Sequence, residues 1–210
     1  MAYWIHSHRE ERRLKRELEI TLEKLEGFKN PKIKLEQYVT PTKLAAFILT
    51  QAKIFEDIDI VVDLGCGTGI LAIGAALLGG DSLGIDVDHE AVSIAKKNAE
   101  KIGVNVDFFV CDVKDFCCKK EVTTIMNPPF GIQKRGADRP FLKKALEISK
   151  VVYSIHSAGS EEFVKKVASE RSFKVTNVWK FKIPLKRTYS FHEKEFKEIA
   201  VEVFRLAKLK

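Results

Sequence analysis

The sequence contains no apolar run near the roughly 18 residues that a membrane-spanning helix requires. The N-terminal residues up to Arg16 carry too many charges for a secretory signal peptide. Cysteine is scarce and never forms a Cys-x-x-Cys pair, so we expect no zinc or other metal site, and mostly buried, reduced thiols. The cysteines are Cys66, Cys111, Cys117 and Cys118. These absences favour a protein that works in the cytoplasm and does not bind a membrane.

Excess charge of one sign is confined to parts of the chain. The net charge is +7, and residues 165–210 hold 13 Lys or Arg against 5 Asp or Glu, whereas the other residues hold 23 against 24. A second basic stretch lies at 131–144. A basic surface on an otherwise neutral domain favours a polyanionic partner such as nucleic acid. The alternative is a solvated surface rich in Lys and Glu, as in heat-adapted proteins.

Short apolar runs alternate with helical patterns along most of the chain. They predict strands at 58–64, 82–85, 104–110, 121–126 and 151–155, and helices at 43–55, 70–78, 88–102, 140–149 and 161–170. We therefore expect an α/β protein with a doubly wound, mostly parallel, seven-stranded Rossmann-like sheet. The last two predicted strands, at 173–183 and 198–206, have no helix between them. They predict an antiparallel hairpin at one edge of the sheet.

The N-terminal part has a different pattern. Leucines at every third or fourth position predict an amphipathic helix over 9–26. We assign residues 1–34 to an extension that carries this helix, and residues 35–210 to the main domain. The segment Thr40-Pro41-Thr42 predicts an N-cap for the helix at 43–55, and it can also form an edge of a cofactor pocket.

A glycine-rich loop at 65–69, Gly-Cys-Gly-Thr-Gly, separates the first predicted strand from its helix. Gly65 and Gly67 let a ligand approach the backbone, and an acid where Asp86 ends the next strand can bond both hydroxyls of an adenosine ribose. A nicotinamide dinucleotide also fits such a loop, but its pyrophosphate would lie badly beside Asp63. The cationic methionine end of S-adenosylmethionine suits Asp63 better. Asp112, after the third strand, is predicted to accept a hydrogen bond from the adenine amino group.

The motif Asn127-Pro128-Pro129-Phe130 ends an apolar, β-branched strand. Because proline lacks an N–H and has a fixed φ, the chain must leave the sheet rigidly at this point. The Asn127 side-chain oxygen and the Pro128 carbonyl can accept hydrogen bonds from the two N–H groups of an exocyclic amine. Phe130 can stack on its ring. Neither acceptor is a base, so alignment and electrostatics are expected to carry the catalysis.

Several motifs together resemble the archaeal and eukaryotic small-subunit ribosomal RNA adenine-N6 methyltransferases, which are class I S-adenosylmethionine-dependent enzymes. The resemblance lies in Gln37-Tyr38-x-Thr40, the loop at 63–69, the segment at 125–131, Tyr153-Ser154-Ile155-His156 and Tyr189-Ser190-Phe191-His192-Glu193-Lys194. It implies S-adenosyl-L-methionine as methyl donor, S-adenosyl-L-homocysteine as product, and adenine N6 in RNA as acceptor. The cofactor-site residues that it implies are Gln37, Thr40, Gly65, Thr68, Ile70, Asp86, Asp112 and Val113.

For the substrate, the resemblance places Asn127, Pro128 and Phe130 around the adenine, Phe191 near the base and His192 near the RNA. Pro129 completes this substrate side. Lys186 and Arg187 lie just before Phe191 and His192, and cations interleaved with aromatic residues suit unpaired RNA. Eukaryotic members also pair with a small zinc-binding activator through an added strand, which makes a sheet edge a candidate docking place.

Physical reasoning leaves the acceptor open. Guanine N2 of ribosomal RNA, adenine in DNA and a protein glutamine are also planar amines that an Asn-Pro-Pro-Phe motif can hold. A further alternative is a low-turnover RNA-binding or ribosome-assembly factor that keeps the cofactor site. The intact set of Asp63, Asp86 and Asn127 favours an enzyme.

Overall fold

The computed structural model describes residues 2–186 and 196–209, and the side chains of residues 8–183 and 198–209. Its strands are β1 (Ile60–Leu64), β2 (Asp81–Asp86), β3 (Asp107–Val110), β4 (Val122–Met126), β5 (Ser149–Ser157), β6 (Phe173–Lys186) and β7 (Phe196–Lys208). Its α-helices are α1 (Ala2–Leu22), α2 (Thr42–Ile54), α3 (Ile70–Leu77), α4 (His89–Ile102), α5 (Arg139–Ile148) and α6 (Glu161–Ser169).

In this part of the chain, seven strands form one sheet in the order β3-β2-β1-β4-β5-β7-β6. Strands β1 to β5 pair in parallel, whereas β7 is antiparallel to both β5 and β6. This arrangement confirms the predicted doubly wound sheet with an antiparallel hairpin at one edge. The strands that follow β1 first add on one side of it, as β2 and β3, and then on its other side, as β4 and β5. At such a switch in strand order, a crevice opens at the carboxyl ends of the strands.

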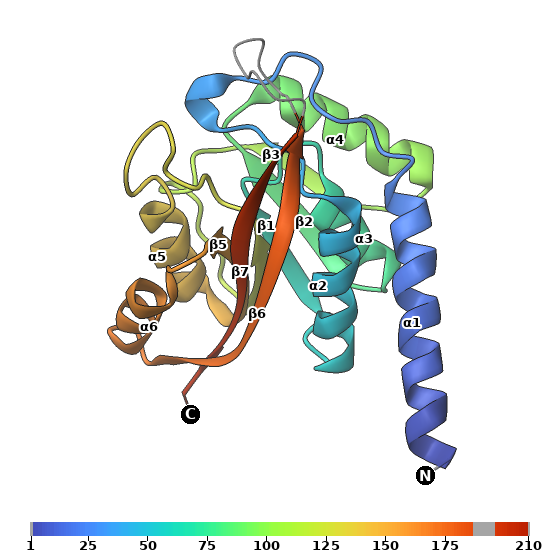
Figure 1. Cartoon of the computed structure of the whole chain (residues 1–210). Coiled ribbons are helices and arrows are strands. Elements are labelled where there is room, and N and C mark those ends of the chain that lie inside the picture. Colours follow the sequence, from blue (N-terminus) through green and yellow to red (C-terminus); the bar gives the residue numbers. More distant parts are fainter. Residues whose placement is uncertain (1, 187–195, 210) are drawn as a thin grey trace.

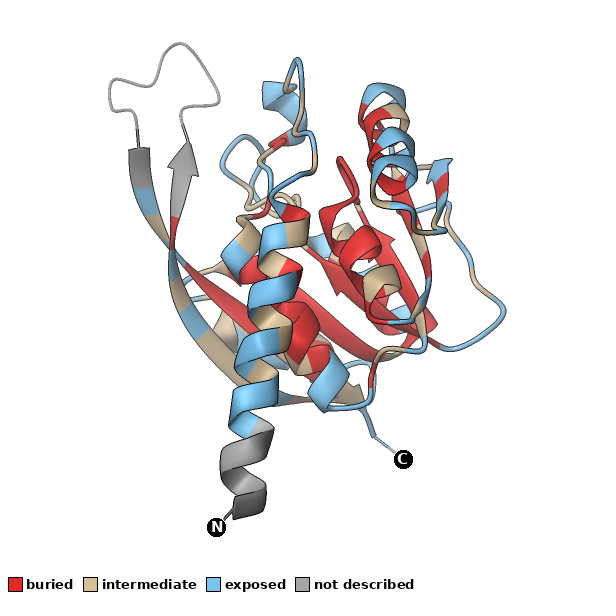
Figure 2. Cartoon of the chain, turned by 90° about the vertical axis from the view of Figure 1, so that its right-hand side faces the viewer, coloured by how far each residue is buried: buried red, intermediate tan, exposed pale blue. Residues whose placement is uncertain are grey.

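Helices cover both faces of the sheet, with α1 to α4 on one side and α5 and α6 on the other (Figure 1). Each face has its own apolar cluster, and the sheet interior between them is almost wholly buried (Figure 2). Leu18 and Leu22 of α1 belong to the same cluster as α2 and α3, so α1 packs on the domain by one apolar stripe. The division of the chain after residue 34 stays a prediction.

The helix boundaries agree with the sequence patterns to within a few residues, except that α1 begins earlier than expected. Asp88 is the N-cap of α4, as its position predicts, and its side chain accepts a hydrogen bond from the Glu90 N–H at 3.1 Å. Strand β3 begins three residues later than predicted, because the Val104 N–H still bonds the Ala99 carbonyl at the end of α4.

One local expectation was confirmed in part and another was wrong. Pro41 of the predicted capping segment is the N-cap of α2, but no side chain caps that helix, because the Thr40 side chain turns toward the end of β4. Of the four cysteines only Cys66 is buried, since Cys111, Cys117 and Cys118 lie on the partly exposed loop and strand end between β3 and β4. Among the described residues, we find no helix that is both long and apolar enough to cross a membrane.

Candidate active site

A cavity of about 370 Å³ opens at the carboxyl ends of β1, β2 and β4, at the crevice that the strand order creates. All ten residues predicted for the cofactor line this cavity: Gln37, Thr40, Asp63, Gly65, Gly67, Thr68, Ile70, Asp86, Asp112 and Val113. Asn127 and Pro129 of the proline motif line it as well. The structure therefore brings together segments that are up to 92 residues apart in the chain, from Gln37 to Pro129.

The glycine loop turns sharply between β1 and α3. Gly65 and Gly67 have φ angles of +73° and +53°, which side chains rarely tolerate. The Gly67 N–H donates to Asp86 Oδ2 at 2.8 Å, and the Asp88 N–H donates to Asp86 Oδ1 at 2.8 Å. Asp86 is thus fixed at the end of β2, and each of its oxygens keeps a lone pair for a hydroxyl donor.

Asp63 has the most strongly shifted carboxyl group of the site. It is buried, and its Oδ2 accepts a hydrogen bond from the Ala72 N–H at 3.2 Å. Its Oδ1 is buried without a hydrogen-bond partner in the described part of the chain. Burial, and secondarily the charge of Asp86, raises the pKa of Asp63 to about 8. A buried carboxyl group with one unpartnered oxygen, beside a cavity, fits a ligand that brings a cation with N–H donors, because such a ligand favours the ionised form.

Gln37 lines the cavity but its amide already has partners. Its Nε2 donates to Asp88 Oδ2 at 2.7 Å, and its Oε1 accepts from the Lys32 N–H at 2.7 Å. Lys32 also forms an ion pair with Asp88 at 2.6 Å. Gln37 therefore anchors the segment before α2 to the start of α4, and its amide keeps one lone pair and one N–H beyond these two bonds.

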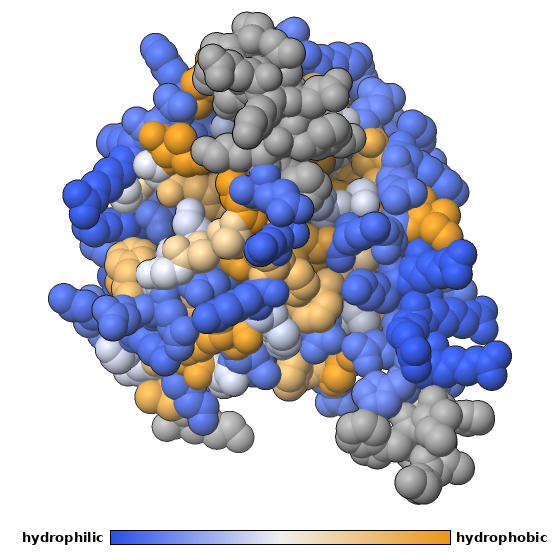
Figure 3. Space-filling view, in the orientation of Figure 1, coloured by the Kyte–Doolittle hydropathy of each residue, from blue (hydrophilic) through white to orange (hydrophobic). Residues whose placement is uncertain are grey.

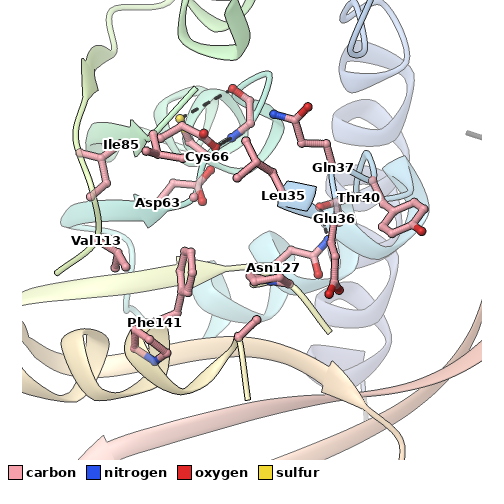
Figure 4. Close-up of a pocket in the computed structure, with 18 of the residues that line it drawn as sticks. Leu35, Glu36, Gln37, Thr40, Asp63, Cys66, Ile85, Val113, Asn127 and Phe141 are labelled. Atoms are coloured by element: carbon pink, nitrogen blue, oxygen red, sulfur yellow. Dashed lines mark hydrogen bonds between the residues drawn. The ribbon is translucent and has the colours of Figure 1, made fainter. Parts of the chain in front are cut away.

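Asn127 lies at the exit of β4, between the segment that carries Thr40 and the strand that carries Asp63 (Figure 4). Its Nδ2 donates to Thr40 Oγ1 at 3.0 Å. Its Oδ1 is buried and has no partner among the described residues. A lone acceptor that is shielded from water costs free energy unless a ligand supplies a donor. This geometry fits the N–H of an amine that enters the cavity.

The remaining predicted substrate residues divide into two groups. Pro128 is buried and Phe130 packs half-buried against the core, and neither is among the cavity-lining residues. The backbone of Lys186 ends β6, but its side chain lies outside the described residues, as do Arg187, Phe191 and His192. The stacking and RNA-binding roles of these residues stay predictions.

Four residues of this site were missed by the sequence reasoning. Phe28 and Phe141 lie so close to Gly67 and Gly65 that a Cβ added to either glycine would come within 2.8 Å of an aromatic carbon. Asn98, from α4, bonds both the Glu26 backbone and the Thr68 carbonyl. Glu36 binds two backbone N–H groups after the proline motif. These contacts join distant segments, so no local pattern marks them.

A doubly wound sheet with a glycine loop after β1, acids at the ends of β1 to β3 and an Asn-Pro-Pro-Phe exit from β4 defines a class I S-adenosylmethionine-dependent methyltransferase. The chain is 38% identical to the rRNA N(6)-adenosine-methyltransferase METTL5 of Danio rerio, over 90% of this chain and 97% of that one. It belongs to the family of rRNA N6-adenosine methyltransferases.

Two further comparisons agree with this family, and a third matches only part of the chain. The Drosophila melanogaster rRNA N(6)-adenosine-methyltransferase Mettl5 is 36% identical over 90% of this chain and 94% of its own length. The crystal structure of a candidate RNA methyltransferase from Pyrococcus horikoshii superposes with a TM-score of 0.87, at 44% identity, covering 93% of this chain and 98% of that one. The family model of ribosomal protein L11 methyltransferase (PrmA) matches residues 40–127.

Proposed function

We propose that this protein transfers a methyl group from S-adenosyl-L-methionine to the exocyclic N6 amine of an adenine in ribosomal RNA. The observation that carries the proposal is the buried, unpartnered Asn127 Oδ1, which lies in the same cavity as the unpartnered Oδ1 of the Asp63 carboxyl group. One acceptor suits the amine that is methylated, and the other suits the cation of the methyl donor. Relatives that share almost the whole chain are rRNA N6-adenosine methyltransferases by name.

The chain's contribution to the chemistry is alignment. When bound, the cofactor supplies an electrophilic methyl group on its sulfonium. Asn127 Oδ1 and the Pro128 carbonyl accept the two N–H groups of the amine, which favours a tetrahedral nitrogen whose lone pair can attack. No base is required before transfer, because the proton can leave after the new bond forms. Preorganised acceptors of this kind act without reorganisation cost at the moment of reaction.

An RNA substrate is supported by charge as well as by the relatives. Lys180 and Lys182 on β6 are exposed, and Lys34, Lys114 and Lys134 line the cavity. The face that includes α1 and β6 carries many hydrophilic side chains, with apolar ones between them (Figure 3). Cations around an adenine-binding cavity suit the phosphates that flank an unpaired base. A base inside a helix would first have to be flipped out.

Two finer points belong to the same proposal. We place the protein in the cytoplasm and name small-subunit rRNA as its substrate. We also propose that a small zinc-binding activator adds a strand along the edge of β3. Phe109 and Val110 of this edge strand are 54% and 52% exposed, and an exposed edge strand is a template for strand addition. If so, Phe109→Lys should abolish co-purification with such a protein while leaving cofactor affinity unchanged.

The decisive test is digestion of RNA to nucleosides after methyl transfer from labelled cofactor. Total RNA, DNA and protein fractions are treated in parallel, and the modified nucleoside is identified by mass. Label in N6-methyladenosine supports the proposal. Label in N2-methylguanosine, in DNA or only in protein identifies one of the other planar amines as acceptor. Cofactor binding with no label in any fraction would instead indicate an RNA-binding or assembly factor.

A further inference from the structure

The hydrogen bond between Thr40 and Asn127 determines which end of the Asn127 amide, the oxygen or the NH₂ group, faces the substrate that receives the methyl group. Asn127 Nδ2 donates to Thr40 Oγ1 at 3.0 Å, and Asn127 Oδ1 remains buried and unpartnered in the cavity. Thr40 itself is buried and lines the same cavity. The orientation matters, because an amide turned by 180° would present N–H to the N–H of an amine, which repels it.

A threonine hydroxyl carries one hydrogen and can accept or donate. Among the described residues, the bond from Asn127 is the one in which the Thr40 oxygen takes part, and it is an accepting bond. The hydroxyl hydrogen is therefore left for an acceptor atom of a ligand in the cavity. Once the Thr40 hydroxyl hydrogen is donated to the ligand, Thr40 Oγ1 can only accept a hydrogen bond. Asn127 can then bond to Thr40 only through its NH₂ group.

We propose that Thr40 is a positioning residue that selects an amine over a carbonyl at the acceptor site by fixing the Asn127 amide. The inference rests on the proposed methyl transfer to adenine and assigns Thr40 a role toward the base in addition to the cofactor. It also couples the two halves of the site: a ligand that takes the Thr40 proton fixes Asn127 before the base arrives.

The test compares adenosine with inosine, which has a carbonyl oxygen in place of the amine. Single-stranded RNA that contains the position methylated by the wild-type protein is bound in the presence of S-adenosylhomocysteine, with either nucleoside at that position. The wild type should favour adenosine by about tenfold, the cost of a buried acceptor without a donor. In Thr40→Val the amide is free to turn, and the adenosine-to-inosine ratio should fall at least about fivefold. Thr40→Ser keeps the hydroxyl and should retain the wild-type ratio.

A purely structural role for Thr40 would weaken both RNAs equally and leave the ratio unchanged, which overturns the inference. Thr40→Ala provides the same comparison if Thr40→Val does not fold, and S-adenosylhomocysteine affinity reports folding in each case. A further control uses Asn127→Asp, whose carboxylate has two equal oxygens. Adding Thr40→Val to that variant should not change the ratio, and a change as large as in the wild-type background would contradict the proposed amide orientation.

Failure of this inference differs from failure of the proposed function. A wild type that methylates no adenosine in RNA refutes the proposed function, and with it the selection of an amine that is assigned to Thr40. A wild type that methylates adenosine, with an unchanged ratio in Thr40→Val and Thr40→Ala, refutes the role of Thr40 alone.

Discussion

Glu36 accepts a hydrogen bond from the backbone N–H of Gly131 at 3.0 Å, through Oε2, and its other oxygen accepts from the Gln133 N–H at 2.7 Å. Glu36 is buried and has a left-handed backbone with a φ of +50°. Non-glycine residues rarely hold such a conformation without compensation. The two bonds tie the segment before α2 to the chain that leaves the proline motif, and so join the cofactor side of the cavity to the substrate side.

Removal of this carboxylate should slow catalysis more than it weakens cofactor binding. Glu36→Ala leaves two backbone N–H groups without their acceptor, at a cost of about 1–3 kcal/mol each where they are shielded from water. We expect a loss of about tenfold or more in single-turnover methyl transfer and a change of no more than about twofold in cofactor Kd. Glu36→Gln should be intermediate. Glu147→Ala, on the exposed side of α5, is the matched control. An equal loss of rate and cofactor affinity would assign Glu36 to the cofactor wall alone.

Asn127→Ala should remove the acceptor that faces the amine. Loss of one preorganised hydrogen-bonding group at a reacting centre costs about 100- to 1000-fold in rate. We expect that loss in single-turnover transfer, with cofactor affinity within about twofold of wild type by calorimetry. Asn105→Ala, at an exposed asparagine before β3, should change neither quantity. A large loss of cofactor affinity in Asn127→Ala would place Asn127 in the cofactor site instead.

The stability of the ligand-free protein should decrease with pH because of Asp63. Its folded pKa of about 8 lies above the ordinary carboxyl value of 3.8, so the folded state holds the proton more tightly than the unfolded state. The stabilisation is complete below about pH 4 and is lost as the pH rises through 8, by at most about 1.4 kcal/mol per pH unit. Chemical denaturation at pH 5 to 8 should show wild type losing stability relative to Asp63→Asn. Parallel curves for the two proteins would contradict the raised pKa.

Cofactor affinity should show the opposite dependence. A cation beside Asp63 binds best when the carboxyl is ionised, so the affinity for S-adenosylmethionine should increase as the pH rises toward 8, by up to about tenfold per unit. Asp63→Asn should flatten the curve. The matched ligand is 5′-methylthioadenosine, which lacks the amino-acid end and should bind with little pH dependence. If both ligands respond equally, Asp63 does not face the methionine end.

Asn98 should contribute to stability as well as to the site. Its Oδ1 accepts from the Glu26 N–H at 2.9 Å, and its Nδ2 donates to the carbonyls of Glu26 and Thr68 at 3.0 and 2.9 Å. Because the side chain is buried, Asn98→Ala removes three hydrogen bonds and should lower the free energy of unfolding by about 3 kcal/mol. Denaturant titration measures this loss, again with Asn105→Ala as control. A change below about 1 kcal/mol would mean that water replaces the amide.

The sequence predicted most of the helices and strands, because strands that are buried on both faces form short continuous apolar runs and helices with one buried face form a periodic apolar stripe. The acids and glycines of the cavity were also predictable, since parallel strands bring their carboxyl ends to one edge. Asp63, Asp86 and Asp112 follow that rule, and all three line the cavity.

The contacts between distant segments were not predictable from local patterns. Glu36 is 95 residues from Gly131, and nothing around it in the sequence distinguishes it from a surface acid. Thr40 looked like a helix cap, because Ser and Thr before a helix commonly cap it. The structure shows its hydroxyl bonded to Asn127 instead. A single sequence shows that Thr40 can form a hydrogen bond, but not whether its partner is the start of α2 or the side chain of Asn127.

Phe28 precedes the segment assigned to the main domain, yet its ring lies over Gly67 with no room for a Cβ between them. One wall of the cavity is thus supplied by the N-terminal segment, which lies outside the seven-stranded sheet and its connecting helices. A chimera that takes residues 1–34 from another family member would therefore receive that protein's residue at position 28 of the cavity, together with its N-terminal helix. Because Gly67 also has a φ of +53°, a side chain there would be strained even without the ring, so we expect divergence in this wall to occur at position 28 and not at position 67.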